Sequence, residues 1–114
     1  MKTLLTRFIG NDAAEMGNEL AQELARRYPL PLDGKGLPKI SADRLSRILE
    51  GVYTKAQSMR DERGLGFFRK TRLCHAFKWN LLEKGYGEEF VNMSTEGLVV
   101  YLSKPLPNNK KPPL

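Results

Sequence analysis

The sequence is poor in the residues that build most metal and thiol sites. Its 114 residues include a single cysteine, Cys74, a single histidine, His75, and a single tryptophan, Trp79. One cysteine excludes an internal disulfide framework and fits a reducing compartment, so we expect a cytoplasmic protein. A structural zinc site uses four Cys or His ligands, and this chain has one of each. We therefore expect no metal site.

Long apolar runs and nucleotide-binding signatures are also missing. No stretch of about 18 apolar residues is present, which excludes a membrane span, and residues 1–9 lack the continuous apolar core of a signal peptide. The Gly34-Lys35-Gly36 stretch lacks the remaining residues of a phosphate-binding loop. The glycines around Phe67 lack the third glycine of a dinucleotide fingerprint. We expect neither a cofactor nor a membrane partner.

No group of titratable residues has a spacing that suits catalysis. Cys74 and His75 are neighbours, and neighbours on a helix point about 100° apart, so they cannot act together as nucleophile and base. The same geometry separates the members of the acidic pairs 61–62 and 88–89, which we interpret as surface charges. The sequence predicts a protein that is not an enzyme.

Positive charge is concentrated in one part of the chain. The net charge is +6, and residues 55–84 contain eight Lys or Arg against three acids. Residues 104–114 add three lysines, together with four prolines and two asparagines, a composition that cannot bury enough apolar surface to fold. We predict one globular domain over residues 1–103, followed by a flexible tail over residues 104–114. The basic region raises the expectation of an anionic partner.

Apolar spacing predicts two helices in the first half of the chain. The first, over residues 13–27, has an apolar stripe at four-residue intervals, flanked by Ala13, Gly17 and Ala21, which would let another helix approach closely. Three prolines and two glycines make residues 29–39 a loop. The second helix, over residues 42–63, begins after Ser41 as N-cap and stops at Gly64. Residues 3–9 fit a helix or a short strand equally.

The second half of the chain predicts a third helix and a β-hairpin. The helix covers residues 66–84 and ends at Gly85, and Leu73, Phe77 and Leu81 share its apolar face. Residues 90–93 and 98–103 alternate like strands around the turn 94–97, in which Gly97 would take a positive φ. The predicted fold class is mainly helical (α+β): about three helices with a C-terminal β-hairpin.

The third helix carries the candidate binding residues. A helical wheel places Arg69, Arg72, His75, Ala76, Trp79 and Asn80 opposite the apolar face, and Lys78 adds to the charge of the helix. Arginine beside an exposed aromatic ring suits base stacking and phosphate contact, or a protein hot spot. Two simpler interpretations stand beside this one, because Trp79 is equally compatible with burial and the cations with an ordinary solvated face.

Three helices followed by a hairpin is the element order of winged helix-turn-helix domains. The run from Lys70 to Tyr86, KTRLCHAFKWNLLEKGY, resembles the recognition helix and the entry to the wing in that class. The resemblance implies that Arg69, Arg72, His75, Lys78 and Trp79 address DNA or RNA. Glu96 at the hairpin tip and the long second helix differ from that class. The alternative is an adaptor or small subunit that offers another protein an apolar helix face, the outward side of the hairpin or the Lys-Pro tail. It could also form a homodimer through the hairpin edge, where Val99 and Tyr101 lie.

Overall fold

The protein, as a computed structural model, has four helices in the residues that the structure describes, which are 12–29 and 41–105. They are α2 (Asp12–Arg27), α3 (Ala42–Arg63), α4 (Phe67–Lys84) and α5 (Glu88–Leu102). Three predictions lie in whole or part outside these residues: the undecided segment 3–9, most of the loop 29–39 and most of the tail 104–114. None of the four helices is both long enough and apolar enough to cross a lipid bilayer.

The predicted β-hairpin is wrong, because the described residues contain no strand and residues 88–102 form α5. Gly97 is not a turn residue: it lies in the middle of α5, where a β-carbon would come within 2.7 Å of Tyr53 Cζ. Tyr53 itself donates a hydrogen bond from its hydroxyl to the Ser94 carbonyl at 2.7 Å. Glycine is therefore required here by the close approach of α3, although it is a poor helix former. The fold class is all-helical.

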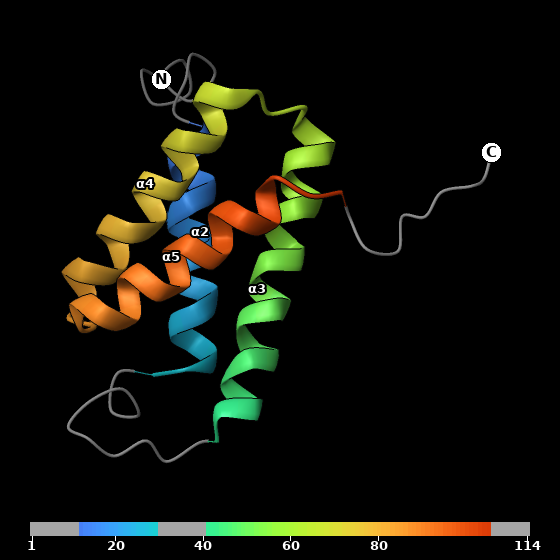
Figure 1. Cartoon of the computed structure of the whole chain (residues 1–114). Coiled ribbons are helices and arrows are strands. Elements are labelled where there is room, and N and C mark those ends of the chain that lie inside the picture. Colours follow the sequence, from blue (N-terminus) through green and yellow to red (C-terminus); the bar gives the residue numbers. More distant parts are fainter. Residues whose placement is uncertain (1–11, 30–40, 106–114) are drawn as a thin grey trace.

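Consecutive helices α3 and α4 make little direct contact, and the other two helices join them. The substantial contacts run from α2 to α4 and α3, and from α5 to the same two helices. In Figure 1, α4 and α3 stand at the two sides, with α2 behind them and α5 in front. Each pair of neighbours in this ring buries a shared apolar stripe, and the core lies where the four stripes meet.

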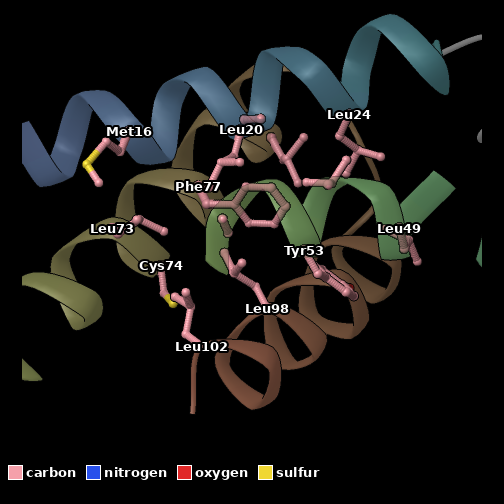
Figure 2. Close-up of a cluster of buried hydrophobic side chains, with 14 of the residues drawn as sticks. Met16, Leu20, Leu24, Leu49, Tyr53, Leu73, Cys74, Phe77, Leu98 and Leu102 are labelled. Carbon is pink, nitrogen blue, oxygen red and sulfur yellow. The ribbon is translucent and has the colours of Figure 1, made fainter. Parts of the chain in front are cut away.

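The core contains fully buried side chains from every helix. Figure 2 shows Leu20 and Leu24 of α2, Phe77 of α4 and Leu98 of α5 converging on one another. Burial of such side chains away from water contributes about 1.5–3 kcal/mol each. This cluster is the main reason that these four amphipathic helices pack together.

Gly17 brings α2 and α4 unusually close. A β-carbon at this position would lie 2.8 Å from the β-carbon of Ala76 and 2.9 Å from the backbone nitrogen of Phe77. The prediction that small residues on this helix allow a close approach is confirmed, and the partner is α4. The same contact fixes which side of α4 faces the protein.

Side chains of α3 hold the C-terminal end of α5. The Gln57 amide donates to the carbonyls of Tyr101 (2.8 Å) and Lys104 (3.3 Å). The Arg60 guanidinium donates to the carbonyls of Leu102 (2.9 Å) and Lys104 (2.6 Å). The last carbonyls of a helix have no partner within the helix, and α5 has no basic residue of its own in its last turn. The two side chains therefore satisfy that end from outside.

The predicted start of α3 and the predicted C-terminal ends of α3 and α4 are confirmed. The Ser41 hydroxyl accepts a hydrogen bond from the Arg44 backbone nitrogen at 3.1 Å and so caps α3. Gly64 and Gly85 end α3 and α4 with φ of 61° and 102°, in the left-handed region that favours glycine. The C-terminal end of α4 is therefore set by a local sequence signal.

Candidate nucleic-acid interface

The structure places the five predicted site residues on α4, with most of them open to solvent. Arg69, Arg72 and His75 are exposed, and Lys78 is half-buried. Trp79 is 53% exposed, so the interpretation of Trp79 as a core residue is wrong. The rings of His75 and Trp79 lie beside each other, with centroids 6.1 Å apart and planes inclined at 42°. An imidazole and an indole therefore share one patch of surface.

The outward face of α4 is rotated from the arc that the wheel predicted. Ala76 lies against Gly17 of α2, and the Asn80 amide donates to Asn18 Oδ1 of α2 at 3.2 Å, so neither residue belongs to the outward face. The centre of the exposed side instead holds Phe68, Arg72, His75 and Trp79, at intervals of four, three and four residues. Such intervals place side chains one above another on a helix. We call these four residues the α4 row.

Phe67 and Phe68, the first two residues of α4, lie on the surface of the protein. They are 73% and 82% exposed, and their rings meet edge to face with centroids 5.4 Å apart. The signal that could have identified Phe68 is its register, because it precedes Arg72 by four residues and His75 by seven. The site therefore extends to the first turn of α4.

The helix itself contains no acidic residue over most of its length. Residues 64–82 contain Arg69, Lys70, Arg72 and Lys78 and no Asp or Glu. Two of these cations follow directly after the N-terminal end of α4, which carries the positive end of the helix dipole and lacks an acidic residue or a side-chain cap. Cations at this end destabilise a helix slightly. An anionic partner would relieve that repulsion.

Several cations of α2 and α3 have acidic partners. Arg26 and Arg27 pair with Glu23 at 2.5 Å and 2.7 Å, and Arg47 pairs with Asp43 at 3.0 Å. Arg69, Lys70 and Lys78 form no ion pair with any other residue in the described ranges. We call the cations at 69, 70, 72 and 78 the α4 basic residues.

A separate apolar groove lies between α4 and α5, beside the α4 row. Its volume is about 180 Å³, and it is lined by Phe67, Lys70, Thr71 and Cys74 of α4 and by Val99, Leu102 and Ser103 of α5. Burial raises the pKa of the Cys74 thiol to about 11, so this cysteine is a thiol at neutral pH and a packing residue. His75 points to solvent, which agrees with the argument against a Cys-His pair.

The outer side of α5 is apolar, and it is a helix face where a strand edge was expected. Val99 and Val100 are both exposed. Tyr101 was predicted to face outward and is half-buried, with its ring centroid 4.8 Å from that of Tyr53. Because the described residues offer no strand, dimerisation through a hairpin edge is not a property of this fold.

No group of three or more metal-ligating side chains occurs in the part of the chain that the structure describes. Comparison of the chain with protein-family models, with curated proteins and with solved structures finds no match. The chemistry of α4 is therefore interpreted from its own residues.

Proposed function

We propose that the protein is a non-enzymatic nucleic-acid-binding protein that uses the exposed side of α4. The observation that carries this proposal is the combination of four cations, exposed aromatic rings and an imidazole on one helix, with no acid between residues 64 and 82. Cations neutralise phosphates and supply most of the affinity, and exposed rings offer surfaces on which bases can stack.

The corrected fold changes how this surface can act. A winged-helix domain would present α4 together with a hairpin that touches the adjacent phosphates, and residues 88–102 are a helix instead. The proposal therefore rests on the surface of α4 alone. The single cysteine is free and buried, which supports a location in the reducing cytoplasm. A cytoplasmic protein has access to RNA or DNA.

A salt titration tests this function. We expect binding to mixed-sequence oligonucleotides with a dissociation constant of about 1–100 μM at physiological salt, weakening steeply as salt increases. The double variant Arg69→Ala/Arg72→Ala should flatten the dependence of log K on log salt by about one unit for each phosphate that the variant no longer neutralises. Absence of binding at low salt would refute the proposal.

Residues of α3 provide a matched control. Arg44→Ala/Arg47→Ala removes the same net charge from exposed positions on α3. If binding is specific to the α4 surface, this control should leave both the affinity and the salt slope nearly unchanged. Equal loss in the two double variants would mean that net charge alone drives binding, which contradicts a localised site.

A second candidate function is a protein contact at the groove between α4 and α5. The observation in its favour is that exposed apolar side chains, Phe67, Val99 and Val100, adjoin an apolar groove. Such continuous apolar surface is typical of protein interfaces. Sedimentation equilibrium tests self-association directly: concentration-dependent dimerisation that Val99→Glu abolishes would support this function, and a monomer at all concentrations would exclude a dimer.

A further inference from the structure

We propose that the nucleic acid bound by α4 is single-stranded, with Phe68 and Trp79 as stacking platforms for its bases. This inference rests on the proposed function and names the ligand class of that same surface. The two rings lie at the ends of the α4 row, with Arg72 and His75 between them. Each ring is exposed while the helix is fully packed on its other side.

The two rings at the ends of the α4 row lie on the surface of the protein. Phe68 is 82% exposed and Trp79 is 53% exposed, whereas Phe77, on the opposite side of the same helix, is completely buried. A large aromatic side chain left in water forfeits the stabilisation that burial would provide. The fold already has a filled core, so Phe68 and Trp79 do not contribute to it. A ligand that covers their faces would recover that free energy.

The faces of bases are available only outside a duplex. In a double helix each base is stacked on both sides, and proteins read its edges with hydrogen-bonding groups such as arginine, asparagine and glutamine. Two of the four positions in the α4 row hold the rings of Phe68 and Trp79. The other two hold Arg72 and His75, which are its main hydrogen-bond donors. Single strands present unstacked bases to aromatic side chains, whatever the sequence.

The geometry of the row fits a short stretch of strand. Eleven residues separate Phe68 from Trp79, which corresponds to about 16 Å along a helix at a rise of about 1.5 Å per residue. That length accommodates several nucleotides. Arg69 follows Phe68 directly and lies about 100° from it toward α2, and Lys78 precedes Trp79 directly and lies about 100° from it in the opposite direction. A strand that follows the row therefore meets cations on both flanks for its phosphates.

The order of residue types argues against a lipid surface as the ligand. A helix that lies on a membrane separates an apolar face from a basic face, so that the apolar face enters the lipid. In the α4 row, Arg72 and His75 stand between Phe68 and Trp79 on one face. Immersing the two rings would also immerse a guanidinium. Alternation of rings and cations suits a polyanion with exposed bases.

Trp79 is the only tryptophan in the chain, so its fluorescence reports on the proposed contact directly. We would titrate the full chain with oligothymidylate, with an oligoribonucleotide of mixed sequence, with a blunt duplex of equal phosphate content and with vesicles containing anionic lipid. We expect both single strands to quench Trp79 and to bind at least about 10-fold more tightly than the duplex, because each stacked base contributes about 1–3 kcal/mol.

Variants of Phe68 test the stacking platform by anisotropy of labelled oligonucleotides. Phe68→Leu keeps an apolar side chain and removes the ring, and it should weaken single-strand binding about 5- to 150-fold, the ratio that corresponds to the stacking of one base. Met93→Ala removes an exposed apolar side chain from α5 and serves as the matched control, with no expected change. Both side chains lie on the surface, so thermal unfolding should show the same midpoint for both variants.

Each of the remaining outcomes would refute a specific claim. Equal affinity for duplex and single strands, without quenching of Trp79, refutes the inference and leaves nucleic-acid binding by the α4 basic residues intact. Absence of binding to any nucleic acid refutes both. Binding to vesicles alone replaces both with a lipid-surface function. Unchanged single-strand affinity in Phe68→Leu refutes stacking on that ring.

Discussion

Replacement of Gly17 by alanine tests whether the close contact between α2 and α4 positions the α4 row. Alanine favours a helix over glycine by about 1 kcal/mol, so in an open site this change would stabilise the protein. At Gly17 the new β-carbon would lie 2.8 Å from the Ala76 β-carbon and 2.9 Å from the Phe77 nitrogen, and the Leu73 carbonyl oxygen is also in its way. The obstacles are mainly backbone atoms, so the helices must separate. Overpacking of this kind costs about 3 kcal/mol, the upper end of its usual range, which leaves a net destabilisation of about 2 kcal/mol.

Denaturation with urea, followed by circular dichroism, measures this difference. Gly51→Ala is the matched control, because Gly51 is exposed in the middle of α3 and its β-carbon would meet only Arg27 Nη1, at an ordinary 3.4 Å. The control should gain about 0.5–1 kcal/mol. The two variants should therefore differ by about 3 kcal/mol, with changes in opposite directions. If Gly17→Ala were as stable as Gly51→Ala, the packing of α2 against α4 described above would be wrong.

Three further changes test the packing that surrounds the site. Gly97→Ala places a β-carbon 2.7 Å from Tyr53 Cζ and should destabilise the protein by about 1–3 kcal/mol in the same assay; a variant as stable as the parent would contradict the close approach of Tyr53 to α5. Arg60→Ala removes the donor to the Leu102 carbonyl and should lower the free energy of unfolding by about 2–3 kcal/mol. An exposed ion pair of arginine contributes less than about 1 kcal/mol, so a loss of that size would contradict the capping role. Because burial raises the pKa of Cys74 to about 11, its alkylation in the native protein should stay slow at pH 8 and accelerate as the pH approaches 11, and rapid reaction at pH 8 would contradict that burial. Since the native state holds this proton more tightly than the unfolded state, the free energy of unfolding should fall as pH rises from about 9 to 11.

Local signals were sufficient to predict the first three helices. The bounds of α3 match the prediction, and those of α2 and α4 differ from it by one residue. Each of these helices combines a sustained apolar stripe with an identifiable start or stop, such as Ser41, Gly64 or Gly85. Capping depends on a few neighbouring residues, so the sequence alone carries this information.

The error at residues 90–103 arose because two periodicities overlap there. Leu98, Val100 and Leu102 alternate as a strand would, but Leu98 and Leu102 are also four residues apart, and together with Val91 they form the buried stripe of α5. Valines and a glycine then favoured a hairpin. What stabilises the helix is tertiary contact: Gln57 and Arg60 cap its end from α3, and Tyr53 packs on Gly97. Contacts between residues more than forty positions apart are not visible to local propensity.

The candidate site was predicted in part for a related reason. Arg72, His75 and Trp79 were placed together correctly, since their spacing is a property of any helix. The wheel could not show which neighbours would cover the flanks of α4. Contact with Gly17 and Asn18 took Ala76 and Asn80 out of the exposed arc, and the exposed arc therefore extends to Phe68.

The arrangement of α4 separates the residues that stabilise the fold from those proposed to bind. Leu73, Phe77 and Leu81 are completely buried and bind α4 to its neighbours, while the α4 row contributes nothing to the core. A large aromatic ring on the surface gives no stability in return for its exposure to water, and two such rings on one helix face fit an interaction surface. If that explanation is a ligand, row variants should lose binding with unchanged stability, and Gly17→Ala should lose stability first. Row variants that lose stability but keep binding would show that the row is not an interaction surface.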